Sequence, residues 1–166
     1  MRRDHGGVHR RGDGRLAWSA LALVTLLATP ARAALGDDVA TVAAAQARLH
    51  ADLTVSHRGS YAIHELAMPS GIRLRHFVGG DGKVFAVSWS GGWRPNLREV
   101  MGSHYDDFIA ATRGKPIKRG VARVETRGMV VVMGGPQRAF FGHVYLTDMV
   151  PADFLSTSND LLDGRP

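Results

Sequence analysis

Two β-turn signals in the middle of the chain constrain its fold more than any other feature. Pro69-Ser70-Gly71 and Asp81-Gly82 are typical hairpin connections, because these residue types tolerate the backbone conformations that tight turns require. Strand-like runs with alternating apolar residues flank both turns, over residues 60–68, 72–78 and 83–90. The sequence therefore predicts a three-stranded antiparallel meander.

The side-chain pattern also sets the register of this meander. With Asp81-Gly82 as a two-residue turn, one face of the last two strands is apolar apart from a single histidine. The residues of that face are Leu74, His76, Val78, Phe85, Val87 and Trp89, and the opposite face carries Arg73, Arg75, Phe77, Ala86, Ser88 and Ser90. A slip by one residue would mix the two sets, because successive side chains of a strand point to opposite faces.

The first turn assigns the same face to the interior. With residues 69–71 as a three-residue loop, Leu66 lies opposite Leu74 on the buried side. Glu65 lies opposite Arg75 on the outer side, where opposite charges stabilise a cross-strand pair. Both hairpins therefore agree on which face of the meander is buried.

Helical periodicity is found on both sides of the meander. A first helix is expected over residues 39–53, with Asp37 or Asp38 as its cap. A second helix is expected to begin near Pro95 and to end at Gly114. Each has one largely apolar face, made of Val39, Val42, Gln46, Leu49 and Leu53 in the first helix and of Leu97, Val100, Met101, His104, Phe108 and Ala111 in the second.

The order of elements predicts the fold class. Three further strands are expected after the second helix, over residues 121–126, 129–133 and 138–146. Helices do not alternate singly with strands, so a doubly wound parallel sheet is not expected. We predict an α+β fold, in which an antiparallel β-sheet of about six strands in two meanders packs with two amphipathic helices in the order α-β-β-β-α-β-β-β. The single domain is expected over residues 34–150, followed by a short polar C-terminal tail over residues 151–166.

The first 33 residues have the layout of a cleavable secretory signal peptide. An arginine- and glycine-rich start precedes the uncharged run LAWSALALVTLLA, and Pro30 and the small-residue pattern Ala31-Arg32-Ala33 follow it. The alternative, an uncleaved anchor, is disfavoured because the run is shorter than the roughly 20 residues that cross a bilayer. We expect cleavage after Ala33, no transmembrane segment after cleavage, and a periplasmic or extracellular location.

Composition excludes several classes of function. The net charge is +6, but six arginines and only two aspartates lie in the first 33 residues, so the rest of the chain has no basic excess that would indicate nucleic acid. The chain has no cysteine, which excludes disulfides and thiolate metal sites within it. We expect no cofactor and no nucleic-acid partner, and the oligomeric state stays open.

His64 and His76 are the candidate metal ligands. The predicted register places them directly opposite each other on the buried face, with Cβ atoms roughly 4.5–5.5 Å apart. Two such imidazoles could share a metal ion, or one could act as a base. No third ligand is spaced alongside them, and Glu65 points to the other face. Structural histidines that are satisfied within the fold are the competing interpretation.

Other motifs carry less chemistry. Residues 79–83, GGDGK, resemble part of a phosphate-binding loop, but a strand follows them where that motif requires a helix. The chain has no Gly-x-Ser-x-Gly motif. Ser103-His104 and Asp106-Asp107 are neighbours on a predicted helix, so the side chains of each pair diverge. No recognisable catalytic motif remains, and the sequence leaves open whether the protein is an enzyme while favouring that it is not.

Aromatic and arginine side chains are the candidate binding residues. Trp93 and Arg94 follow the third strand of the meander, and these two residue types are enriched at binding hot spots. The competing interpretation is that Trp93 covers the open end of the core. Phe77, beside Arg73 and Arg75 on the predicted outer face, would extend a binding surface if no other part of the chain covers it.

The central hairpins resemble a known family. The stretch HELAMPSGIRLRHFVGGDGKVFAVSWSG, with PNLREVMGSHYDDF and RAFFGHVYL downstream, is similar to a bacterial family of small exported proteins catalogued as domain-of-unknown-function family 2844. The resemblance extends from about residue 34 to about residue 151. It implies export and a compact domain, and it implies no reaction and no set of catalytic residues.

The sequence therefore predicts an exported, non-enzymatic binding or accessory module of the periplasm or envelope, whose partner is an unidentified envelope protein or ligand. One alternative is a small cell-envelope hydrolase or metal-binding protein that uses His64 and His76, with Glu65 as a further catalytic candidate in the hydrolase. Another is a subunit of an envelope or secretion assembly, which would pair through a sheet face or an exposed edge strand.

Overall fold

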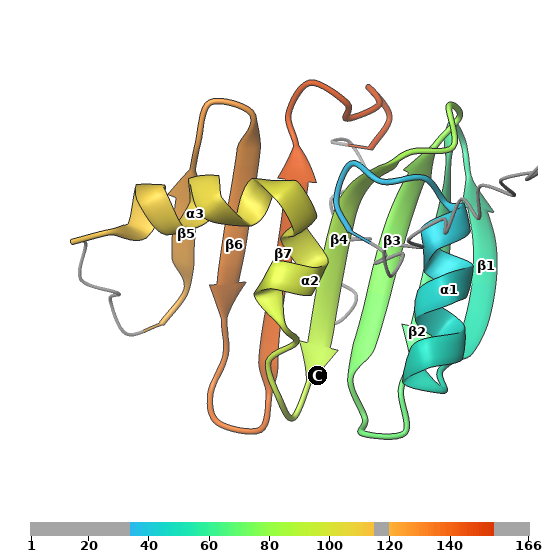
Figure 1. Cartoon of the computed structure of the whole chain (residues 1–166), viewed down its shortest axis with the longest axis horizontal. Helices are drawn as coiled ribbons and strands as arrows, with labels where there is room; N and C mark the ends of the chain where they lie inside the picture. The colour runs from blue at the N-terminus through green and yellow to red at the C-terminus, as the bar shows by residue number, and fades with distance from the viewer. Residues whose placement is uncertain (1–33, 115–119, 155–166) are drawn as a thin grey trace, which may run out of the picture.

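The computed structural model describes residues 34–114 and 120–154. Its centre is one antiparallel sheet of seven strands in the spatial order β1-β2-β3-β4-β7-β6-β5 (Figure 1). The strands are β1 (Asp52–Arg58), β2 (Tyr61–Ala67), β3 (Arg73–Gly79), β4 (Val84–Gly91), β5 (Ala122–Glu125), β6 (Met129–Gly134) and β7 (Phe140–Leu146). The helices are α1 (Ala40–Leu49), α2 (Leu97–Met101) and α3 (Tyr105–Thr112), with the 3-10 turn η1 (Gly102–His104) between the last two.

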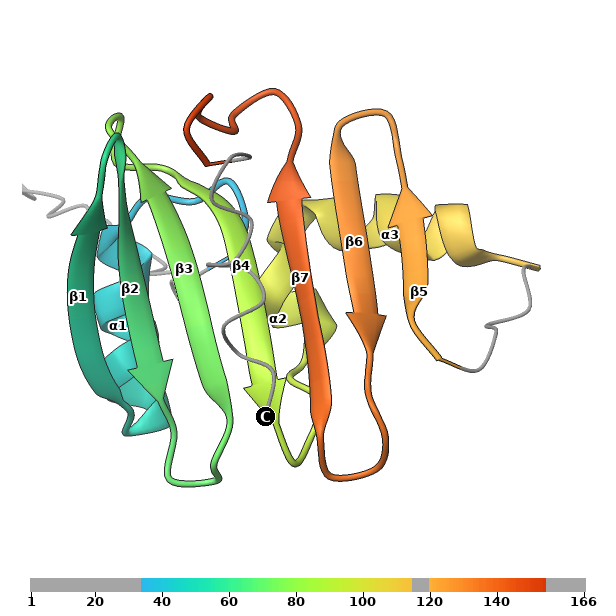
Figure 2. The same ribbon diagram turned by 180° about the vertical axis from the view of Figure 1, so that it is seen from behind.

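The sheet is made of two meanders that join at its centre. Strands β1 to β4 form the first and β5 to β7 the second, and pairing between β4 and β7 unites them. The segment α2-η1-α3 carries the chain from β4 to the far edge strand β5 (Figure 1). All helices lie on one face of the sheet, as the view from behind confirms (Figure 2). In the described ranges no helix is long and apolar enough to cross a membrane.

The predicted α+β class is confirmed. The predicted strand count and element order were wrong, because the first helix is shorter than expected and a seventh strand follows it. This helix ends at Leu49, and residues 52–58, which include Leu53, form the extra strand β1. The cause is His50, which adopts a left-handed conformation with φ +49°. The Ala51 N–H then donates to the Gln46 carbonyl, a bond that closes the helix end. Leu53 still faces the interior, so both interpretations fit its spacing. At the other end of the helix, Asp38 accepts a hydrogen bond from the Ala40 N–H (3.0 Å).

The second predicted helix is not continuous. Asn96, the residue after Pro95, caps its start, and the Asn96 side chain accepts a hydrogen bond from the Arg98 N–H at 3.1 Å. Gly102 then takes φ +55°, and a Cβ at this position would lie 2.6 Å from the Cβ of Ala34. The chain turns there because residues at the start of the domain pack against it, and α3 leaves in a new direction.

The register of the central hairpins is confirmed at most positions. Leu66 pairs with Leu74, and Leu74 pairs with Trp89. A β-bulge after Phe77 then shifts the pairing, so that Val78 lies opposite Val84 and not opposite Phe85. Phe85 therefore leaves the helix-covered face to which the sequence pattern assigned it.

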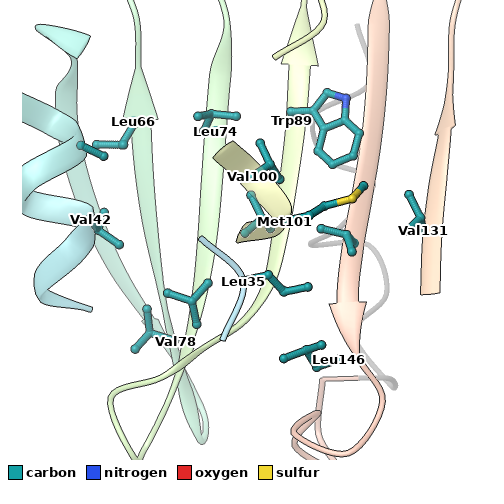
Figure 3. Packing of buried hydrophobic residues seen from close by; sticks show 14 of the residues in the cluster. Leu35, Val42, Leu66, Leu74, Val78, Trp89, Val100, Met101, Val131 and Leu146 are labelled. Carbon is teal, nitrogen blue, oxygen red and sulfur yellow. The ribbon is translucent and has the colours of Figure 1, made fainter. Parts of the chain in front are cut away.

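The main core lies between the helices and the sheet (Figure 3). Trp89 and Met101 are buried at its centre, with Val100 beside them. Trp89 lies against Gly142 on the neighbouring strand β7, where a Cβ would fall within 2.6 Å of the indole Cε2. The absence of a side chain at Gly142 is therefore what makes room for the indole ring.

The opposite face of the sheet carries a second, aromatic core. Tyr61, Phe77 and Phe85 lie on it, and Phe154 packs over all three with ring centroids 4.9–5.4 Å away. Phe77 was expected on an exposed outer face and is instead completely buried. The expected polar tail begins at residue 151, yet the packed part of the chain reaches Phe154.

Asp153 fastens this C-terminal segment to the turn between β1 and β2. Its carboxylate accepts hydrogen bonds from the Ser60 hydroxyl (2.5 Å) and the Ser60 N–H (3.0 Å). These bonds, with the hydroxyl first, lower the pKa of Asp153 below its ordinary value of 3.8. A carboxyl with a depressed folded-state pKa stabilises the fold above its unfolded pKa, and this contribution is lost as the pH falls through the folded value.

We therefore expect acid to remove the advantage that Asp153 gives. In urea denaturation, wild type should be more stable than Asp153→Asn at neutral pH, and the difference should shrink as the pH falls below 3.8. Asp52→Asn, a change at an exposed carboxylate on β1, is the control and should show no such convergence. A constant difference between wild type and Asp153→Asn from neutral to acid pH would contradict the role of the carboxylate charge.

Candidate binding cleft

A cleft of about 290 Å³ lies on the helix-covered face of the sheet, between α1 and α2. Figure 1 shows β3 passing beneath the space that separates the two helices. Alternation along β3 points Leu74 and His76 into this face, and both form the floor. Most of the remaining lining is apolar and comes from α1, α2, the segment before α2 and the hairpin between β2 and β3: Ala45, Leu49, Met68, Ile72, Pro95 and Val100.

An ion pair joins the two helices at this cleft. Arg48 of α1 donates to Glu99 of α2 at 2.9 Å, across 51 positions of sequence. The other carboxylate oxygen of Glu99 accepts from the Asn96 amide at 3.2 Å. The two side chains of the ion pair remain 44% and 30% exposed, so the pair adds little to stability. Its consequence is geometric, because it fixes charged groups beside an apolar space.

Arg94 is a second arginine in the lining of the cleft. Its Cζ lies 4.8 Å from the centroid of the Phe140 ring, a cation–π contact that orients the planar group. Within residues 34–114 and 120–154 no carboxylate pairs with it. Trp93, the preceding residue, is 71% exposed and does not cover the core as one interpretation of the sequence proposed.

The two candidate metal ligands are cross-strand partners, as the register predicted. His76 is buried, whereas His64 is half-buried. The pKa of His64 is lowered, first by burial and then by the nearby charge of His57. Among the residues that the structure describes, no group of three His, Asp or Glu side chains gathers there or elsewhere to hold a metal ion. His76 also lines the cleft, which His64 does not.

The other predicted binding residues lie on the far side of the sheet. Arg75 and Arg73 pair with Glu65 at 2.6 and 3.6 Å, and Arg75 is the less exposed of the two. Phe77, which was to extend this surface, is covered by Phe154. The five proposed binding residues are therefore divided between the two faces, and only Arg94 joins His76 in the cleft.

Sequence reasoning missed several polar residues. Arg48 and Glu99 lie on separate helices, and nothing in the sequence signals that they meet. On the far face, Ser88 lies opposite Arg75 on one side and His143 on the other, and Ser88 and His143 are both buried. Finding that row required the pairing of β4 with β7, which no local signal encodes.

The fold and the cleft together define a class: small α+β proteins with one antiparallel sheet, whose helices cover a single face and enclose a cleft there. The chain belongs to the family described as "Protein of unknown function (DUF2844)", whose model matches residues 31–158. The family resemblance of the central hairpins is thereby confirmed. Comparisons with curated proteins and with solved structures found no match.

Proposed function

We propose that the protein is an exported, non-enzymatic binding module whose cleft between α1 and α2 receives a small, largely apolar ligand. The observation that carries this proposal is the cleft itself. Its volume of about 290 Å³ lies just below the roughly 300–1,000 Å³ range of ligand pockets, and its mostly apolar lining includes a few polar groups. The ligand is therefore smaller than a typical drug-sized molecule.

Export is part of the same proposal. The leader pattern of residues 1–33 lies outside the described residues, so its support is the sequence. Ala34 and Leu35 are already buried, which fits a domain that begins at the expected cleavage site. N-terminal sequencing of the protein from a periplasmic fraction tests this, because Ala34 is the expected first residue. A chain that retains its leader in the soluble fraction would contradict it.

Filling the cleft is expected to abolish binding. Ala45 is a buried small residue of α1 that lines the space, so Ala45→Leu places a larger side chain inside it. Titration with the neutral fluorescent probe N-phenylnaphthylamine should give saturable binding to wild type, weakened about ten-fold or more by Ala45→Leu. Leu49→Trp, at a half-buried position of the lining, fills the cleft from its rim if Ala45→Leu does not fold.

The matched control for this experiment is Ala44→Leu. It makes the same change on the same helix at an exposed position outside the cleft, and it should leave probe binding unchanged. Equal binding of the probe by wild type, Ala45→Leu and Leu49→Trp would contradict the proposal that the cleft is the binding site. Circular dichroism on each variant separates loss of binding from loss of fold.

Specific observations also favour the alternative functions. The pairing of His64 with His76 favours a metal-binding protein, and the place of His76 in the cleft floor favours a hydrolase. A zinc-dependent rise in Tm, reversed by a chelator, would favour the first, and ester hydrolysis lost in His76→Ala would favour the second. An envelope-assembly subunit would use the edge strands β1 and β5, and strictly monomeric elution in envelope extract counts against it.

A further inference from the structure

We propose that the ligand of this cleft is an amphipathic anion, an aliphatic chain that ends in a carboxylate, with the chain inside the cleft and the carboxylate on Arg94. This inference rests on the proposed binding function and adds the chemical class of the ligand. It follows from two observations: the apolar floor and walls, and the way in which the charges of the cleft are already paired.

The apolar part of the cleft selects the body of the ligand. Leu74 of the floor is buried beneath the space, and Leu49 on α1 and Ile72 on the hairpin between β2 and β3 also line it. An aliphatic chain placed there removes apolar surface from water on both partners, which is the main source of affinity for such a ligand.

The charges of the cleft select the head group. Among the described residues that line the cleft, Glu99 is the only one with a carboxylate, and both of its oxygens already accept hydrogen bonds, from Arg48 and from Asn96. Arg94 has no carboxylate partner in the parts of the chain that the structure describes. A cationic head group would therefore meet a satisfied carboxylate and a repelling guanidinium, whereas an anionic head group finds an unused donor.

The position of Arg94 strengthens this selection. The Cζ atom of Arg94 lies 4.8 Å from the centroid of the Phe140 ring, and this contact restricts the movement of the guanidinium. An arginine that is fixed in this way loses less side-chain freedom when it binds a carboxylate, and it can donate two parallel hydrogen bonds. Arg94 thus combines a place in the lining of an apolar cleft with a guanidinium that is already restrained.

The test is displacement of N-phenylnaphthylamine from the full mature chain by three compounds with the same chain: octanoate, octanol and octylamine. We expect octanoate to displace the probe at about ten-fold lower concentration than octanol, a difference of ~1.4 kcal/mol, with octylamine the weakest. Added sodium chloride should weaken octanoate and leave octanol unchanged, because salt screens an exposed charge pair.

Substitution of Arg94 should remove only the preference for the anion. Arg94→Gln is expected to bring octanoate to the level of octanol while octanol is unaffected, and Arg94→Lys, which retains the charge, should keep part of the preference. Arg98→Gln is the matched control, since Arg98 also stacks on an aromatic ring, Tyr105 at 4.4 Å, but does not line the cleft. It should behave as wild type.

The outcomes separate this inference from the function on which it rests. Equal displacement by octanoate and octanol, independent of salt, would overturn the anion while the cleft stays a binding site. An octanoate preference that survives in Arg94→Gln would overturn the role of Arg94. If wild type bound neither the neutral probe nor any one of the three compounds, both proposals would be overturned together.

Discussion

Replacing Phe154 by alanine is expected to cost about 3–5 kcal/mol of unfolding free energy, the range for a buried phenylalanine. Only 1% of Phe154 is exposed, and its ring packs edge-on against Tyr61, Phe77 and Phe85. The substitution would open a cavity over the aromatic core and expose Phe77. Since whole domains are stable by about 5–15 kcal/mol, this single change removes a large share of the total.

Urea denaturation followed by circular dichroism measures this effect. Phe154→Leu should lose clearly less than Phe154→Ala, because it leaves a smaller cavity. Trp93→Ala is the control, since it truncates an aromatic side chain that is 71% exposed and should change stability by no more than about 0.5 kcal/mol. If Phe154→Ala matched wild type, the C-terminal segment would not belong to the cooperative unit.

The second large effect is expected at Gly142. A Cβ added there would fall within 2.6 Å of the Trp89 indole and 2.8 Å of the Val132 carbonyl oxygen, distances that require something to move. Trp89 is buried between the sheet and α2, so it has no open space to enter. We expect Gly142→Ala to cost about 1–3 kcal/mol or more, the usual penalty for overpacking a core.

Two further variants test the cause that we assign to this effect. Gly128→Ala adds a methyl group where no atom lies within 4 Å, so it should be nearly neutral. In a Trp89→Phe background, Gly142→Ala should cost less than in wild type, because the smaller ring leaves room for the methyl group. Additive effects of Gly142→Ala and Trp89→Phe would show that the clash is not the source of the destabilisation.

Local patterns predicted the central hairpins because hairpin geometry is encoded by neighbours. The loop at 69–71 sets the pairings of Leu66 with Leu74 and of Glu65 with Arg75, and both are found. The same approach failed at Phe85, because a β-bulge inserts one residue without any local signal. It failed at His50 too, since the residues after it fit a helix or a strand equally well by spacing.

The candidate site was predictable only in fragments. Arg94 and His76 were singled out by residue type and register, but the cleft that unites them also needs α1, α2 and the hairpin between β2 and β3. Those elements are far apart in the chain, and the Arg48–Glu99 pair spans 51 positions. Sequence periodicity identifies which face of an element is apolar, and it does not identify which element will cover that face.

The sequence by itself determined the α+β class, strands β2 to β4 and β5 to β7 as local units, and the pairing of β2 with β3, because each depends on contacts between residues close in the chain. Only the tertiary structure decided that β4 pairs with β7, that all helices cover one face, and that Phe154 seals the other. The local sequence does not distinguish these long-range contacts from their alternatives. The contacts that form are those that together bury the most apolar surface, and this buried surface is a property of the folded chain as a whole.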